Sequence, residues 1–147
     1  NRRVYVVGYD VATALGNTFE KTWQAAVDGL AGFRRLTRCQ STSRSNVVGE
    51  IPDWHPNSFP YVDRKEASLW NASYVFLTME VCRRALGHAG LEINSETGPR
   101  TGCLIGSALN GTDSYRIAMD NYVNSGPLKV SPYLLPNVCA NLPARQP

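Results

Sequence analysis

Cysteine and histidine are among the residue types that could supply a nucleophile, a base or metal ligands. The four cysteines are far apart and form no Cys-x-x-Cys pair, which argues against a zinc site and against a disulfide framework. Neither histidine has a cysteine, aspartate or glutamate at the spacing of a metal site or a catalytic triad, so a structural role is favoured for both. These residues are Cys39, Cys82, Cys103, Cys139, His55 and His88.

Cys139 is the cysteine with the best claim to reactivity. It lies in the closing stretch VSPYLLPNVCANLPARQP, near a plausible helix start, and a helix start would favour a thiolate. Its neighbours Val138, Ala140 and Leu142 are small or apolar and offer a thiolate no partner, so we expect Cys139 not to be a nucleophile. Cys82 falls on an apolar helical stripe and Cys103 inside a strand pattern, which predicts that both are buried.

A glycine-flanked turn, GSALNG at residues 106–111, is the second candidate for chemistry. Its spacing resembles the opening of a phosphate-binding loop, but such a loop continues with Lys and then Ser or Thr. Here Thr112 and Asp113 follow, and the carboxylate would repel phosphate. Nucleotide binding is therefore disfavoured, and two interpretations stay open: a turn that glycine permits, or a backbone that approaches a ligand closely.

Composition limits the class of protein. The 147 residues are 43% apolar and 18% charged, which is ordinary for one globular unit. The net charge of +3 comes from scattered basic residues, so a nucleic-acid interface is disfavoured. The same weak positive charge is compatible with an acidic protein partner, although composition alone does not identify one. No apolar run approaches the length of a membrane span and no signal peptide is evident, so we expect a cytoplasmic protein without a membrane segment. No cofactor is expected.

The elements that must position these residues alternate between strands and helices. Apolar patterning predicts buried strands at Val4–Tyr9 and Thr101–Ser107 and a short possible strand at Asn46–Ile51. A helix follows Asn17, which we expect to be its N-cap, and its apolar residues recur at helical spacing up to Leu30. Further helices are predicted at Lys65–His88, ending at Gly90, and at Asp113–Asn124. The pattern is that of a layered α/β protein whose sheet is incomplete within these residues.

Five stretches, in order and in register, resemble a known family. They are VYVVGYDVATALGNTFEKTWQAAVDGLAGFRRLT, VGEIPDW, DRKEASLWNASYVFLTMEVCRRALGHAGLE, GCLIGSALNG and VSPYLLPNVCANL. Together they are similar to the N-terminal part of the elongating β-ketoacyl-acyl-carrier-protein synthases, which have the thiolase fold. The resemblance implies that residues 1–147 are a partial N-terminal β-ketoacyl synthase domain, one half of a layered α-β-α-β-α thiolase-like fold.

The resemblance also implies a reaction, a decarboxylative Claisen condensation in fatty acid or polyketide synthesis. A cysteine thiolate would take an acyl chain from a carrier thioester, and two histidines would stabilise charge on the thioester oxygens. In the family these three residues come later in the chain, so no catalytic residue is expected within residues 1–147 and this portion alone should be inactive. The alternative is a non-catalytic partner subunit of the chain-length-factor type. A thiolase or an initiating enzyme fits less well, because VSPYLLP and DRKE are typical of the elongating type.

Four site residues follow from the resemblance. Leu109 matches the apolar residue that gates the acyl channel, and Leu134 and Leu135 match positions that reach across a dimer interface to close it. Packing in the core is the alternative for these leucines. Lys65 matches a basic residue that docks the acidic carrier protein. The implied partners are the acyl carrier protein, acyl and malonyl thioesters and a second copy of the chain, because Tyr133, Leu134 and Leu135 form an apolar patch between prolines.

Overall fold

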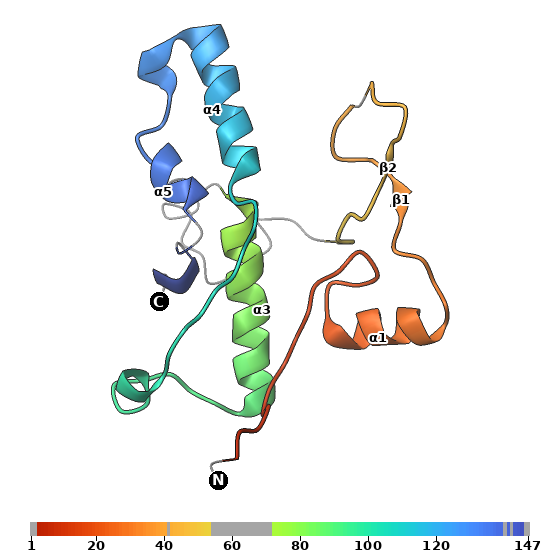
Figure 1. Ribbon diagram of the computed structural model, residues 1–147, viewed down its shortest axis with the longest axis vertical. Coiled ribbons are helices and arrows are strands. Elements are labelled where there is room, and N and C mark those ends of the chain that lie inside the picture. The colour runs from red at the N-terminus through yellow and green to blue at the C-terminus, as the bar shows by residue number, and fades with distance from the viewer. Residues whose placement is uncertain (1–2, 41, 54–71, 140, 142, 146–147) are drawn as a thin grey trace. The chain divides into compact units, whose positions relative to one another are not determined.

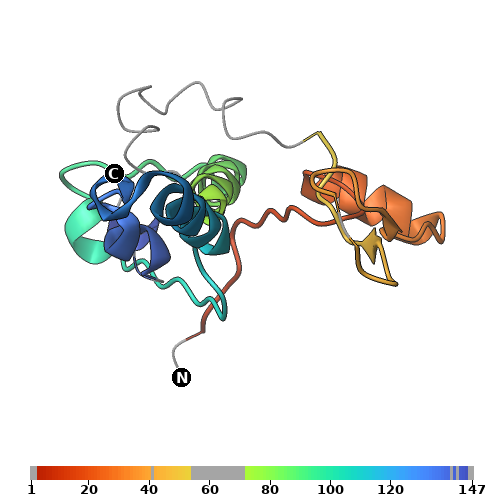
Figure 2. The same cartoon turned by 90° about the horizontal axis from the view of Figure 1, so that it is seen from above.

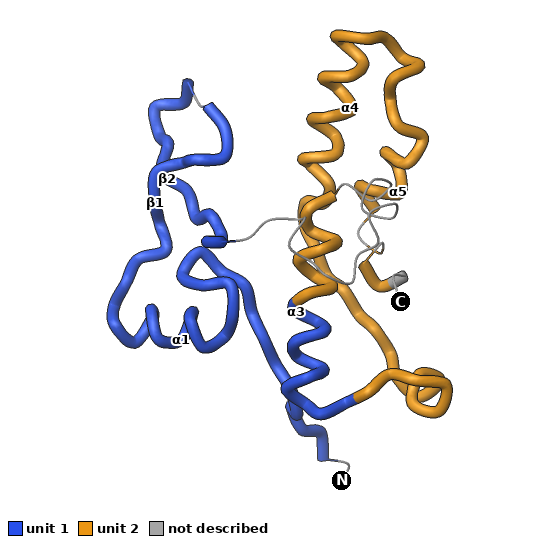
Figure 3. Tube along the Cα trace, turned by 180° about the vertical axis from the view of Figure 1, so that it is seen from behind, with its two compact units in different colours: residues 1–55, 81–91 blue, residues 56–80, 92–147 orange. Residues whose placement is uncertain are grey.

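The computed structural model describes residues 3–40, 42–53, 72–139, 141 and 143–145 (Figure 1). Its contacts divide the chain into two compact units, one of residues 1–55 and 81–91 and one of residues 56–80 and 92–147 (Figure 3). We call them unit 1 and unit 2. The α-helices are α1 (Phe19–Val27), α3 (Ser73–Ala89), α4 (Thr112–Ser125) and α5 (Leu134–Val138). Short 3-10 helices are η2 (Gly98–Arg100), η3 (Pro127–Lys129) and η4 (Pro143–Arg145).

The described β-structure is a single antiparallel pair in unit 1. β1 (Arg34–Arg35) pairs with β2 (Val47–Val48), with Arg34 opposite Val48 and Arg35 opposite Val47. The predicted strand at Asn46–Ile51 is thus confirmed for Val47–Val48, and the partner β1 was not expected. The chain combines helices with a small sheet, in keeping with a mixed α and β protein.

The two longer predicted strands do not form among the described residues. Val4–Tyr9 and Thr101–Ser107 run as open segments, and Val4 and Leu104 are 94% and 98% exposed. The prediction of buried strands is therefore wrong for this structure. A strand needs neighbours that satisfy its backbone N–H and C=O groups, and the described residues provide no such neighbours for these two segments.

Helix ends in unit 1 follow local rules. Thr18, not the predicted Asn17, is the N-cap of α1, because its hydroxyl accepts a hydrogen bond from the Lys21 N–H at 3.3 Å. α3 ends in a Schellman motif: Gly90 adopts φ +64°, its N–H bonds to the Gly87 carbonyl, and the Leu91 N–H bonds to the Leu86 carbonyl. The predicted role of Gly90 is confirmed. The predicted start of this helix at Lys65 lies outside the described residues.

Asp10 ties the N-terminal segment of unit 1 to two helices. One carboxylate oxygen accepts a hydrogen bond from the Phe19 N–H at the start of α1, at 2.8 Å, and the other pairs with the Arg84 Nε on α3, at 2.6 Å. Next to it, His88 Nδ1 lies 3.1 Å from the Tyr9 carbonyl oxygen, and the two rings meet edge to face. His88 therefore has the structural role expected of it, whereas His55 lies outside the described residues.

In unit 2, α4 and α5 lie side by side in both views (Figures 1 and 2). The core of this unit is small. Ala72 and Val75 are buried, with Tyr74 and Met79 packed against them. Phe76 on α3 and Ala118 on α4 are also buried.

Much apolar surface stays uncovered within the described residues. On α1 the buried residue is Ala25, whereas Trp23 is 61% exposed. Cys82 and Cys103 are also exposed, so the prediction that both are buried is wrong. An apolar stripe is buried only when another element covers it, and nothing described covers these residues. Within the described residues, no helix is both long and apolar enough to cross a membrane.

Candidate functional site

The predicted channel residues all belong to unit 2. Leu109 stands in the bend between the open segment 101–107 and α4, and its side chain is 84% exposed. Leu134 and Leu135 begin α5; Leu134 is half-buried and Leu135 is 74% exposed. The predicted docking residue Lys65 lies outside the described residues. The bend and α5 are thus the two structural features on which the predicted channel depends.

Gly111 joins these two features. It is the N-cap of α4 with φ +57°, a left-handed conformation that glycine adopts without strain. A Cβ atom there would clash with the Asn137 carbonyl oxygen and lie 3.0 Å from the Val138 Cα. The close backbone approach around the GSALNG turn is therefore an approach to α5, and it fixes the bend against that helix.

Asp113 and Tyr74 hold the start of α3 to the same junction. The Asp113 carboxylate accepts hydrogen bonds from the Ser73 N–H, at 2.8 Å, and from the Ser114 N–H, at 3.0 Å. Tyr74 donates a hydrogen bond to the Cys139 carbonyl oxygen at 2.6 Å. Partial burial raises the pKa of Tyr74, and the nearby Cys139 and Asp113 act in the same direction. In the sequence, Asp113 was considered only as a group that would repel phosphate. Its position in the first turn of a predicted helix is the signal that could have indicated its bonds to backbone N–H groups.

Leu134 lines a small cavity between α4 and α5. The cavity measures about 50 Å³, which suits one or two water molecules and is far too small for an acyl chain. Leu109 and Leu135 do not line it, so the described residues do not bring the three leucines into one cavity. The lining residues are Ser114, Ile117, Ala118, Asn121, Ser131, Leu134 and Asn137.

Cys139 lies at the C-cap of α5, not at a helix start. Its Sγ donates a hydrogen bond to the Leu135 carbonyl oxygen at 3.2 Å, an interaction that only the protonated thiol makes. That Cys139 is not a nucleophile stays a prediction. The described residues contain no cluster of His, Cys, Asp and Glu that could hold a metal ion.

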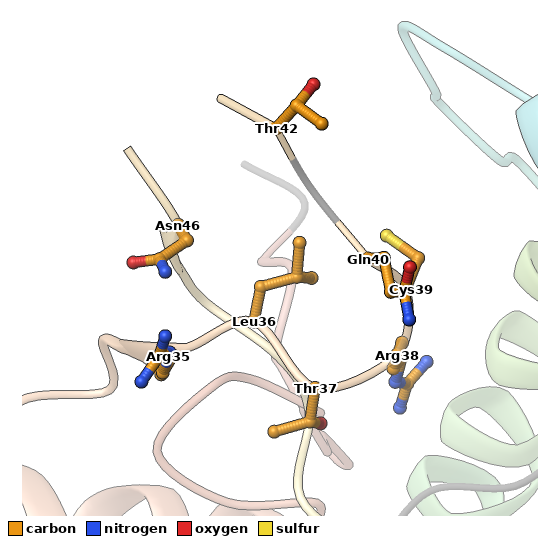
Figure 4. Close-up of a pocket in the computed structure, with 8 residues that line it drawn as sticks. All are labelled: Arg35, Leu36, Thr37, Arg38, Cys39, Gln40, Thr42 and Asn46. Atoms are coloured by element: carbon orange, nitrogen blue, oxygen red, sulfur yellow. The ribbon is translucent and has the colours of Figure 1, made fainter. Parts of the chain in front are cut away.

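Unit 1 contains a second, larger hollow in the hairpin of β1 and β2. It measures about 680 Å³ and is open to solvent. Figure 4 shows Leu36 pointing into the space between Asn46 and Gln40, with Arg35 and Arg38 on opposite sides of Leu36. The sequence did not reveal this hollow, because a stretch rich in Ser, Arg and Asn indicates only a surface excursion. The lining residues are Arg35, Leu36, Thr37, Arg38, Cys39, Gln40, Thr42 and Asn46.

Glu50 anchors the base of this hairpin. Its carboxylate accepts hydrogen bonds from the Thr37 N–H at 3.0 Å, the Thr37 hydroxyl at 2.7 Å and the Arg38 N–H at 3.1 Å. The Thr37 hydroxyl and N–H lower the pKa of Glu50, and Arg38 adds to the effect. Through these three hydrogen bonds Glu50 holds residues 37–38 in place.

Comparison with known proteins identifies the family. The family model described as "Beta-ketoacyl synthase, N-terminal domain" matches residues 1–145. The chain is 33% identical to 3-oxoacyl-[acyl-carrier-protein] synthase 2 of Coxiella burnetii over 142 residues, which are 96% of this chain and 34% of that protein. The proteins of the same name from Staphylococcus aureus strain COL and Vibrio harveyi are 29% and 31% identical, over 99% and 97% of this chain and 35% and 34% of their own length. This chain thus spans about a third of the length of these relatives, and it belongs to the β-ketoacyl synthase family, whose N-terminal domain it matches.

Proposed function

We propose that the full-length protein is a 3-oxoacyl-acyl-carrier-protein synthase, an acyltransferase that lengthens acyl chains in fatty acid synthesis. The observation that carries the proposal is the family match over residues 1–145, together with the relatives described above, which are named as synthases. The alternative of a non-catalytic partner subunit is not favoured by these names.

The proposed reaction has two transfers. In the first, a cysteine thiolate attacks an acyl carrier thioester, the acyl group moves to the cysteine sulfur, and the carrier thiol leaves. In the second, malonyl carrier loses CO₂, and the resulting carbanion attacks the acyl carbonyl carbon and releases the cysteine thiolate. The product is a 3-oxoacyl carrier thioester. The cysteine and two histidines that carry these steps are expected outside residues 1–147.

We propose that this chain contributes walls and surfaces to that enzyme. Leu109, Leu134 and Leu135 would line the acyl channel, and Lys65 would help to dock the carrier. The exposure of Leu109 and Leu135 supports this role, because large apolar side chains gain free energy when a substrate or a second subunit covers them. Association as a homodimer and a cytoplasmic location are parts of the same proposal.

The layered thiolase-like fold is also a proposal. Two apolar open segments, Val4–Tyr9 and Thr101–Ser107, support it, because such segments complete a sheet when neighbouring strands pair with them. In that arrangement the residues exposed here would be buried between layers.

The test uses the full-length protein with acyl carrier and malonyl carrier substrates. We expect release of CO₂ and formation of the 3-oxoacyl carrier product. Incubation with acyl carrier alone should leave the acyl group on a cysteine outside residues 1–147, which mass spectrometry can map. A protein that accepts no acyl group would be the non-catalytic subunit. Acylation of Cys139 would show that the site lies in this chain and that the match of its last stretch is wrong.

A further inference from the structure

Positive charge gathers on the hairpin of unit 1. We define the arginine hairpin as residues 34–48, from the start of β1 to the end of β2. It contains four arginines and no aspartate or glutamate, so it carries more positive charge than the net +3 of the whole chain. The arginines are Arg34, Arg35, Arg38 and Arg44. All four are exposed.

Two of these arginines are positioned by backbone carbonyls. The Arg34 Nη2 donates to the Ala14 carbonyl oxygen at 2.7 Å, and the Arg38 Nη2 donates to the Ile51 carbonyl oxygen at 3.2 Å. A carbonyl is a neutral acceptor, so these bonds orient the guanidinium groups and leave their charge in place. Glu50 is the nearest carboxylate in sequence, and its oxygens bond to Thr37 and to the Arg38 backbone.

The other two arginines, Arg35 and Arg44, form no ion pair within the described part of the chain. Phe33, the residue before β1, is 76% exposed and lies two residues before Arg35 in the sequence. Exposed arginines together with an aromatic side chain are the composition enriched in protein–protein interfaces. A nucleic-acid site fits less well, because a single aromatic residue accompanies the arginines and the chain as a whole is only mildly basic.

We propose that the arginine hairpin is a docking surface for an acidic face of the acyl carrier protein. This inference rests on the proposed function, which requires a carrier protein to deliver the acyl group. Phe33 would give the contact an apolar anchor, and Arg35 and Arg44 would attract carboxylates around it. Charge pairs at the rim of an interface act over about a Debye length, so they mainly raise the association rate and depend on salt.

The experiment measures binding of the apo carrier protein to the full-length synthase by fluorescence anisotropy. The variants are Arg35→Glu and Arg44→Glu, and the control is Lys129→Glu, an exposed residue of η3 in unit 2 that changes the net charge equally. Each hairpin variant should weaken carrier binding by about threefold to tenfold at low salt, and the difference should shrink at high salt. The control should bind within about twofold of the parent protein.

A kinetic readout separates docking from chemistry. In the hairpin variants, KM should rise for the acyl carrier and stay unchanged for a short acyl thioester of pantetheine, with kcat unchanged for both. Equal binding by all variants, an equal loss in the control, or tighter binding of a DNA duplex than of the carrier would overturn the docking proposal. A protein that binds the carrier through the hairpin and condenses neither substrate would overturn the proposed function while leaving the docking surface intact.

Discussion

Gly111 shows how one residue can fix the arrangement of two helices. Replacement by alanine would force a Cβ atom into the Asn137 carbonyl and hold a left-handed φ that alanine disfavours. We expect Gly111→Ala to lower the free energy of unfolding of the full-length protein by about 1–3 kcal/mol, measured by urea denaturation. Gly87→Ala is the matched control. Gly87 lies inside α3, where an added Cβ atom would have nothing within 4 Å, so alanine there should be neutral or stabilising by about 0.5–1 kcal/mol.

Leu109 provides the residue-scale test of the acyl channel. Its exposed side chain follows the Gly106–Ser107 end of the open segment, where a substrate chain could reach it. In the full-length enzyme, Leu109→Trp should reduce kcat/KM for the longest accepted acyl chains by about tenfold, because a bulkier wall excludes methylene groups. Short acyl chains should be affected much less. An unchanged chain-length profile would contradict the channel assignment.

Individual residues were predictable from the sequence where their role is local. Gly90 was recognised as a helix terminator because a Schellman motif depends on only a few neighbouring residues. The environments of Cys82 and Cys139 were not predictable, because burial and helix-end position depend on which elements pack together.

At the scale of elements, Asp10 links the N-terminal segment to α1 and α3. Its carboxylate is 7% exposed and pairs with Arg84, whose side chain is 23% exposed. Asp10→Ala should destabilise the protein by about 2–4 kcal/mol, because it removes the carboxylate that pairs with the shielded Arg84 guanidinium and that accepts a hydrogen bond from the Phe19 N–H. Asp120→Ala is the control, since the exposed Arg116–Asp120 pair on α4 should contribute at most about 0.5 kcal/mol. Thermal unfolding that affects both variants equally would contradict this role for Asp10.

Glu50 gives the arginine hairpin a pH dependence. Its folded-state pKa is lowered from 4.5, so its bonds stabilise the hairpin above that value and are lost as the pH falls through the folded pKa. We expect the Thr37 amide to lose protection from hydrogen exchange as the solution is acidified below pH 4.5. In Glu50→Gln the same amide should exchange at a rate that, after correction for intrinsic exchange, does not change over this range. A parent protein whose Thr37 amide shows no acid-dependent change would contradict the assignment.

The longer helices were predictable and the two longer strands were not, for a physical reason. α4 was expected at residues 113–124 and is found at Thr112–Ser125, because its bonds join residues four apart and its end is marked by Gly126. The open segments Val4–Tyr9 and Thr101–Ser107 have strand-like sequences, but strand pairing depends on residues far away in the chain. The apolar patterning therefore indicates which segments can form strands, but it does not identify the strands with which they would pair.

At the scale of the whole molecule, the small core and the uncovered apolar residues have one common explanation. Exposed residues occur in both units, among them Val4, Trp23, Leu104 and Leu135. Since the chain spans about a third of the length of its relatives, we expect the rest of the full-length protein and a second subunit to cover most of this surface. The small number of predicted strands indicated from the sequence that the sheet is incomplete, and the family resemblance gave a reason for it.

The dimer prediction belongs to this scale and centres on Leu135. Leu135 is 74% exposed on α5 and Tyr133 is 38% exposed, so apolar side chains are exposed where we predict a subunit interface. We expect the full-length protein to sediment as a homodimer, and Leu135→Asp to raise the dimer dissociation constant by about tenfold or more, because a carboxylate would be buried without a partner. Leu128→Asp on η3 is the control: Leu128 is 97% exposed but lies outside the predicted interface, so this variant should remain dimeric. Analytical ultracentrifugation over a dilution series distinguishes the two variants. A parent protein that is monomeric at every concentration, or a Leu135→Asp variant that dimerises as tightly as the parent, would contradict the interface.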